Sequence, residues 1–352
     1  MASWGYLLGD LNLNTDFAVL DWPTGIIRLN CTYKEFERLT TKIDLDMNES
    51  CLNERELAET ISHESFHYMQ MCTSGFLYSF VVDLFESIGK CVPRGEFKDL
   101  KDMFDIIDPQ SPAAIKIQNN CRAQFDNKGP KGLTVRSIVE SAAMLVQKRM
   151  HRPNLNAQRY LEILDSLQLD EEYRSAYDVT LKYLGENAFN SYPFLSYLSL
   201  CTSHPTQALV YLCQSIEGQK IYNGVNLNRS LFADLLKRSS LEVIGSSTDV
   251  ARGKGIQHPI YFETIHHLNE LIEQNRLNIF EYLVAPHLLP NSLAQPLVRP
   301  SLFKKNNGKY YAHLPESVWP EMSKDQRRDK FEVLLCLFAA SARILGIFAP
   351  PP

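Results

Sequence analysis

The sequence predicts a mostly α fold of the α+β class, in which a small N-terminal β element packs on a larger helical bundle. Two observations lead to this fold class. A pair of β-prone runs joined by a turn lies near the N-terminus, and apolar residues at helical spacing recur through most of the chain that follows. The 352 residues, 45% of them hydrophobic and 22% charged, are enough to bury a sizeable core.

Composition excludes two broad classes of protein. Aromatic residues make up 11% of the chain and the formal net charge is only −5, whereas a wholly disordered chain has few aromatics and a high net charge. The sequence pI near 6.0 argues against a dedicated nucleic-acid binder, which needs a basic face to neutralise phosphates. We therefore expect no nucleic-acid partner, although a local basic patch stays compatible with this balance.

Cysteine usage and the absence of targeting signals predict a cytoplasmic protein. The eight cysteines are scattered, mostly in apolar runs, and none forms a Cys-x-x-Cys pair, so we expect free thiols that pack as small hydrophobic side chains. The N-terminus lacks the basic start and the apolar core of a signal peptide. Since the most apolar stretch, 334–348, is short and carries Arg343, we expect no membrane span.

The N-terminal β element is predicted as a hairpin, with runs 17–22 and 26–31 joined by a Pro-Thr-Gly turn. The first long helix is predicted over 54–72, because Asn53 followed three residues later by Glu56 is typical of a helix cap with its reciprocal carboxylate. An almost wholly apolar helix follows over 76–88. Further helices are predicted at 134–150, 157–166, 171–184, 189–202, 207–216, 231–237, 259–280 and 324–348.

These elements suggest one compact unit with two lobes. Residues 1–91 contain the β element and the helix 54–72, and residues 134–352 form a helical domain. Between them, 92–133 is a more polar segment interrupted by turn signals, which we expect to be an insertion. A second segment, the Gly/Ser-rich stretch 245–258, is expected to be a surface loop.

The motif His63-Glu64-Ser65-Phe66-His67 lies inside the predicted helix 54–72. Residues four apart lie one turn apart on the same helix face, so the two imidazoles converge on one point. That is how two ligands of a tetrahedral zinc ion are supplied, at Zn–N distances of about 2.0–2.1 Å. Glu64 is placed to reach a metal-bound water without being a ligand, and there it would act as general base. Chance alone gives this pattern roughly 0.015 times in a chain of this composition.

Two acids compete as the third metal ligand. Gln70 and Thr73 stand where a metzincin needs a glycine and a ligand, which excludes that class. Glu86 lies nineteen residues after the second histidine, the spacing seen in one large aminopeptidase family of gluzincins. However, Ser79, Asp83 and Glu86 form a polar stripe on an otherwise apolar helix, which is typical of a solvent-facing edge.

Glu140 is the other candidate, and we favour it. It is the only acid in the apolar helix predicted over 134–150, where an unpaired buried carboxylate is costly and a divalent metal offsets that cost. Ala143, one turn along, is small enough to let two helices approach and share an ion. The alternative for Glu140 is an ion pair with Arg136, four residues earlier.

The two motifs together resemble the gluzincin group of zinc metallopeptidases. More narrowly, they are similar to bacterial proteins with the pattern H-E-x-x-H-x-x-Q and a later E-S-x-A helix, here Glu140-Ser141-x-Ala143. The resemblance covers two helices and implies a zincin-like fold, with zinc bound by His63, His67 and Glu140 and with Glu64 as the base.

The chain departs from the thermolysin-like pattern beside the third ligand. Val139 and Met144 stand where that pattern has asparagine and aspartate, so the acid that would orient the histidines is left open. Glu59, one turn before His63, is a candidate for that role.

The function predicted from these residues is that of a zinc-dependent metalloprotease acting on a protein or peptide. The substrate is expected to lie extended across the cleft and to pair with an edge strand of the β element. The alternative is a non-catalytic helical interaction module whose zinc site is structural or vestigial. A regulatory partner protein is a further expectation, with segments 92–133 and 245–258 as mobile lids through which it would act.

Overall fold

The chain is described by a computed structural model over residues 4–8, 18–36, 52–92, 105–152, 154–167, 171–215, 220, 222–223, 226–227, 230–235, 283, 301–304, 310–313 and 322–345. Over these ranges the protein is mostly helical with few strands, as predicted. Among the described helices, none combines the length and the apolar character that crossing a lipid bilayer requires. The predicted helix 259–280 and loop 245–258 lie outside the described residues.

A five-stranded sheet forms the β part of the fold, with strand order β1-β7-β6-β3-β2. The predicted hairpin is confirmed, since β2 (Ala18–Asp21) and β3 (Ile26–Leu29) pair antiparallel with Leu20 opposite Ile27. The sheet is larger than that hairpin. It is completed by β1 (Trp4–Leu8) and by two strands that come late in the chain, β6 (Ser301–Lys304) and β7 (Tyr310–His313).

The hairpin turn is closed by a glycine and an aspartate. Gly25 has a φ of +67°, a conformation that residues with a Cβ atom rarely adopt. Its N–H donates to the carbonyl of Asp21 over 2.7 Å. The Asp21 carboxylate in turn accepts hydrogen bonds from the backbone N–H and the hydroxyl of Thr24. These bonds fix the position of β2, which lies at the edge of the sheet.

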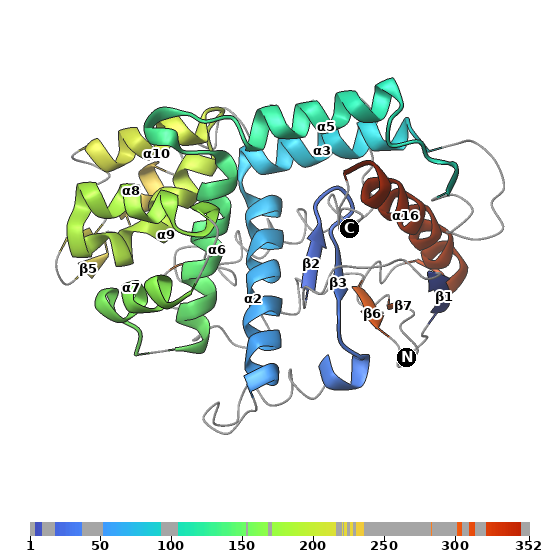
Figure 1. Ribbon diagram of the computed structural model, residues 1–352, viewed down its shortest axis with the longest axis horizontal. Coiled ribbons are helices and arrows are strands. Elements are labelled where there is room, and N and C mark those ends of the chain that lie inside the picture. The colour runs from blue at the N-terminus through green and yellow to red at the C-terminus, as the bar shows by residue number, and fades with distance from the viewer. Residues whose placement is uncertain are drawn as a thin grey trace.

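The sheet lies between α2 (Leu52–Thr73) and α16 (Lys324–Leu345), as Figure 1 shows. Side chains alternate along the strands, so Leu20 and Ile27 face the main core while Asp21 and Ile26 share the other face. On that second face the Ser341 hydroxyl of α16 donates to Oδ1 of Asp21 over 2.6 Å. Both faces of the hairpin are thus covered by helices.

The remaining helices build the bundle around α2. These helices are α3 Gly75–Gly89, α5 Pro112–Phe125, α6 Val135–His151, α7 Ala157–Ser166, α8 Ser175–Leu184, α9 Ala188–Leu200 and α10 Pro205–Gln214. The predicted helix 157–166 is confirmed with the same bounds, and the predictions for α2, α3, α6, α8, α9, α10 and α16 agree within a few residues. Figure 1 shows α7 to α10 gathered on the side of α6 that faces away from the sheet. Short 3₁₀ turns lie at Pro130–Gly132, Glu171–Tyr173 and Gly185–Asn187. Two short strands, β4 (Tyr222–Asn223) and β5 (Asn226–Leu227), pair with each other.

Helix α5 lies within the segment 92–133, for which no helix was predicted from the sequence. Ser111 caps this helix by accepting a hydrogen bond from the N–H of Ala114, and Pro112 occupies the first turn, where its missing N–H costs nothing. Only Ala114, Ile117 and Phe125 are buried along α5, so the apolar signal in the sequence is sparse.

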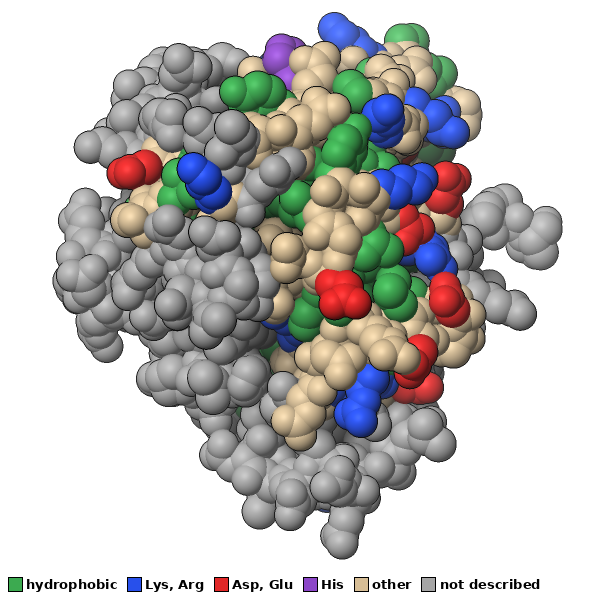
Figure 2. Space-filling view, turned by 90° about the vertical axis from the view of Figure 1, so that its left-hand side faces the viewer, with side chains coloured by type: hydrophobic (Ala, Val, Ile, Leu, Met, Phe, Trp, Pro, Cys, Tyr) green, Lys and Arg blue, Asp and Glu red, His purple; other side chains and the backbone are tan. Residues whose placement is uncertain are grey.

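The outer face of the helices α7 to α10 carries no concentration of one charge. In Figure 2 the acidic and basic side chains drawn in colour alternate among hydrophobic ones on this face.

Candidate metal centre

Helix α2 carries both histidines of the motif on its buried face. It runs unbroken through His63 and His67, two residues that are 7% and 3% exposed, so the imidazoles lie one turn apart as predicted. The helix ends where the N–H of Ser74 donates to the carbonyl of Gln70 and α3 begins. The first histidine lies in the middle of the helix, where the backbone is least free to move.

Helix α6 supplies the acid. Thr134 caps it by accepting from the N–H of Ser137, whose hydroxyl accepts from the Thr134 N–H in return. Glu140 follows on the helix face that packs against α2. Ala143, on the same face and one turn along, is fully buried, in agreement with the predicted close approach of these helices.

The two helices are antiparallel, and a buried ion pair fixes their register. Lys148 of α6 donates to Oε2 of Glu59 on α2, and both side chains are less than a tenth exposed. Arg152 adds a second contact to the same carboxylate, at 3.4 Å. Because Glu59 is engaged there, it does not take the predicted role of orienting His63.

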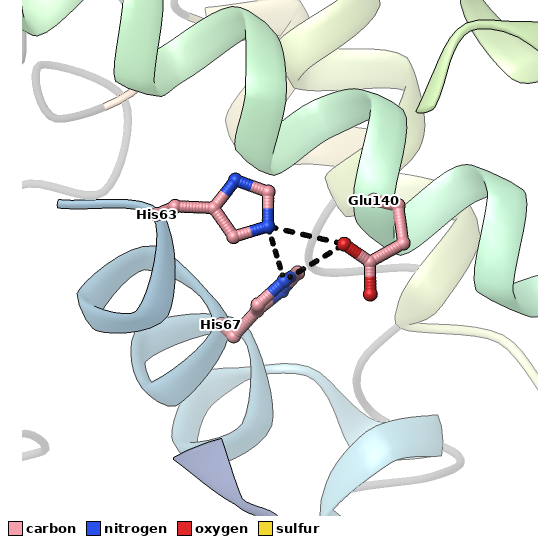
Figure 3. A group of neighbouring side chains, drawn as sticks. All are labelled: His63, His67 and Glu140. Atoms are coloured by element: carbon pink, nitrogen blue, oxygen red, sulfur yellow. Dashed lines mark hydrogen bonds and ion pairs between the residues drawn. The ribbon is translucent and has the colours of Figure 1, made fainter. Parts of the chain in front are cut away.

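Three ligand atoms converge between α2 and α6. Nε2 of His63 and Nε2 of His67 lie 3.1 and 3.2 Å from Oε2 of Glu140, and 2.9 Å from each other. Figure 3 shows the two imidazoles on α2 pointing toward the carboxylate on α6. These three residues form the one group of His, Cys, Asp and Glu side chains in the described part of the chain that is arranged to hold a metal ion.

The two Nε2 atoms and Oε2 of Glu140 form a triangle of nearly the size that three ligands of a tetrahedrally coordinated ion require. Bonds of about 2.0–2.1 Å place the ligand atoms of a tetrahedral zinc ion about 3.3–3.4 Å apart. The three observed separations are shorter than this by only a few tenths of an ångström. His63, His67 and Glu140 could therefore hold one ion as three protein ligands and would leave a further coordination position for a non-protein ligand.

The competing assignments for the acids fail on geometry. Glu86 accepts a hydrogen bond from Lys90 over 2.8 Å and is absent from the group around the histidines, while Asp83 of the same stripe is exposed. Arg136 directs its guanidinium to Asp126, at 2.7 Å, instead of to Glu140. Of the two acids weighed from the sequence, the structure brings Glu140 to the histidines.

Two glutamines contact the far side of the imidazoles. Nδ1 of His63 lies 3.1 Å from Oε1 of Gln147, and Nδ1 of His67 lies 3.1 Å from Oε1 of Gln70. Both glutamines are buried. Where an acid was expected to orient the histidines, the structure has two amides, and Gln147 has no signal in the sequence beyond lying two turns after Glu140 on the same helix face.

Glu64 lies beside this group and is fixed by the sheet. Its Oε2 accepts a hydrogen bond from the backbone N–H of Leu20 over 2.9 Å, which ties it to the edge strand β2. Burial raises the pKa of Glu64, and this effect outweighs the opposing influence of His67 and His63. A raised pKa suits a carboxylate that takes up a proton near neutral pH.

The three candidate ligands are electrostatically coupled. Burial opposes a charge on His67, yet the adjacent carboxylate of Glu140 prevails and raises the pKa of His67 to about 9. Burial likewise opposes a charge on Glu140, but His67 and His63 lower its pKa below the ordinary value. Without an ion, therefore, the group holds a proton that balances the carboxylate.

Two aromatic side chains that the sequence did not single out flank the histidines. The Trp22 ring lies 5.5 Å from that of His67, and the Tyr173 ring lies 6.1 Å from that of His63, measured between centroids. Trp22 comes from the hairpin turn and Tyr173 from the short turn before α8. Both are half-buried, so they border the site and reach solvent.

In comparisons with known proteins, no family model matches the sequence, and no curated protein or solved structure matches the chain. The resemblance to gluzincins and the zincin-like fold therefore stay predictions that rest on the motifs and on the geometry described above.

Proposed function

We propose that this chain is a zinc-dependent metalloprotease, with His63, His67 and Glu140 as metal ligands and Glu64 as the general base. The observation that carries the proposal is the convergence of two imidazole nitrogens and one carboxylate oxygen within 3.2 Å of one another. The gluzincin resemblance, which rests on the spacing of these residues in the sequence, also supports it.

The chemistry of the donor set fits zinc. Two imidazoles and one carboxylate from the protein, with a further position left for water or substrate, are typical of catalytic zinc sites, whereas structural sites are closed by four protein ligands. A calcium or magnesium site would be built mainly from oxygen ligands. An ion held here would polarise a substrate carbonyl and lower the pKa of a coordinated water.

The residues around the ligands fit peptide hydrolysis. Glu64 takes the proton of the attacking water and passes it to the leaving amine, a role that its raised pKa favours. The edge strand β2, whose Leu20 N–H holds Glu64, offers backbone groups with which an extended peptide can pair. We place this peptidase in the reducing cytoplasm, where the described cysteines, none of them in a disulfide, are stable as thiols.

The test compares the purified wild type with Glu64→Gln, using total metal analysis and cleavage of a mixed library of quenched fluorescent peptides. We expect about one zinc ion per chain in both proteins. Cleavage should fall about 10²- to 10⁴-fold in Glu64→Gln, whose amide still accepts from Leu20 but cannot accept a proton as a base. Glu162→Gln, on the surface of α7, is the matched control and should behave as wild type.

Two outcomes would contradict the proposal. Wild-type protein without bound zinc removes its basis, and full cleavage by Glu64→Gln removes the assigned base. Zinc in the wild type together with cleavage of no peptide, and with higher thermal stability in the loaded form, would instead support the non-catalytic module with a structural ion.

A further inference from the structure

We propose that Gln70 and Gln147 are positioning residues that hold both metal-ligating histidines in the Nδ1–H tautomer. Through this tautomer they leave a lone pair on Nε2 of each neutral imidazole, so that the group closes only by taking up an added proton or a metal ion. The inference rests on the proposed metal centre and adds the reason why its ligand atoms carry free lone pairs.

The two contacts that carry the inference are of the same kind. Each imidazole places Nδ1 3.1 Å from an amide oxygen, His63 against Gln147 and His67 against Gln70. The two glutamines are 7% and 1% exposed, so water does not compete for the imidazoles. They come from different helices, Gln70 from α2 and Gln147 from α6, so both helices of the site contribute.

An amide oxygen only accepts hydrogen bonds, so the imidazole nitrogen facing it must donate. A neutral imidazole carries one proton, and an Nδ1–H therefore leaves Nε2 with a lone pair. Both Nε2 atoms then face Oε2 of Glu140 and each other as acceptors, at 2.9 to 3.2 Å. Three converging lone pairs repel one another unless an added proton or a metal ion lies between them.

With the opposite tautomer, the group would need no cation between its three ligand atoms. With the proton on Nε2, each histidine would donate directly to Glu140, and the three side chains would form a satisfied buried cluster that needs no ion. The glutamine oxygens are the contacts that disfavour this arrangement. The hydrogen-bond partners of the histidines, Gln70 and Gln147, are neutral amides. Glu140 therefore carries the one negative charge among the two histidines, the two glutamines and itself, so a divalent ion bound there would keep a net positive charge.

Two kinds of substitution distinguish the effect of losing the hydrogen-bond acceptor from the effect of changing the packing. Gln70→Met and Gln147→Met keep the length of the side chain and remove the acceptor, whereas Gln70→Glu and Gln147→Glu keep an acceptor and strengthen it. Gln158→Met, at an exposed position of α7, is the matched control.

The experiment measures zinc affinity by chelator competition on the full-length protein. It also records ¹H–¹⁵N NMR of histidine-labelled, zinc-loaded protein and the visible absorption of the cobalt form. We expect Nδ1–H signals for both histidines in the wild type. Each Met variant should bind zinc about 10- to 100-fold more weakly and change the cobalt spectrum, and each Glu variant should bind at least as tightly as wild type.

The inference is overturned if the loaded wild type shows Nε2–H on either histidine, or if both Met variants bind zinc as the control does. If a Met variant does not fold, the Glu variant at the same position decides, because weaker zinc binding there contradicts an acceptor role. Wild-type protein that binds no zinc overturns the proposed function as well. Zinc binding with unaltered variants overturns only the role of the glutamines.

Discussion

Leu20 donates its backbone N–H to Oε2 of Glu64 over 2.9 Å, a bond that links the edge strand of the sheet to the residue between the two histidines. Leu20 lies on β2, whose other side pairs with β3, so this N–H points away from the sheet. The bond orients the carboxylate without drawing it into the ligand group. In the proposed function, a peptide that pairs with β2 would lie next to Glu64, the proposed base.

Leu20→Pro removes that N–H and leaves the pairing of β2 with β3 intact, because edge strands tolerate proline where the N–H faces outward. We expect kcat/KM for peptide cleavage to fall about 10- to 100-fold through loss of orientation, with zinc content unchanged. Leu20→Val, which keeps the N–H, is the control. Equal activity of the two variants would show that the bond does not position Glu64.

Glu140→Ala should release zinc and abolish cleavage together, because it removes one of three protein ligands. Glu86→Ala should leave both nearly intact, since Glu86 is engaged by Lys90 at the surface of α3. Zinc per chain, measured by mass spectrometry after dialysis, separates the two variants. Retention of zinc by Glu140→Ala would require a different third ligand.

The metal-free protein should lose stability as the pH rises from about 6.5 to about 9. The pKa of His67 is raised in the folded state, so its protonated form adds stability that is complete below the unfolded pKa and lost as pH passes the folded value. Urea unfolding in the presence of a chelator measures this loss. Zinc-loaded protein should not show it, because the ion replaces the proton, and Glu140→Gln should flatten it by removing the charge responsible.

Glu59→Ala should destabilise the protein by about 3–5 kcal/mol, because it leaves the buried ammonium of Lys148 without its carboxylate. Replacing both partners, in Glu59→Met with Lys148→Met, should restore much of that loss, since an apolar pair of similar volume needs no charge compensation. Chemical denaturation of the metal-free forms gives both values. Equal destabilisation by the single and the double variant would show that packing, not charge, dominates here.

The residues of the candidate site were largely predictable because the sequence immediately around each of them makes it conspicuous. Two histidines four residues apart in a helix must share a face, and Glu140 was conspicuous as the one acid in an apolar helix. The contacts of Gln147 were not predictable, since an amide on a helix is ordinary. Its meeting with His63 depends on how α2 and α6 are rotated against each other, which neither segment encodes alone.

The sheet was predictable only at its hairpin, where a turn joins the two strands. Strands β6 and β7 are four residues each and find their partners through pairing with β3 and β1, near the other end of the chain. Short strands of this kind carry little periodicity of their own. Helix α5 was missed for a related reason, since it buries only three apolar side chains against the bundle.

The sheet joins early and late parts of the chain, and from this we expect a particular order of assembly during synthesis. Asp21, next to Leu20, is bonded to Ser341, a residue 320 positions later. The helices with His63, His67 and Glu140 can pack before β6 and α16 have been made, but an isolated hairpin is only marginally stable in water. We therefore expect a nascent chain to bring His63, His67 and Glu140 together first, and Glu64 to receive its fixed orientation only when the last strands and α16 close on β2 and β3.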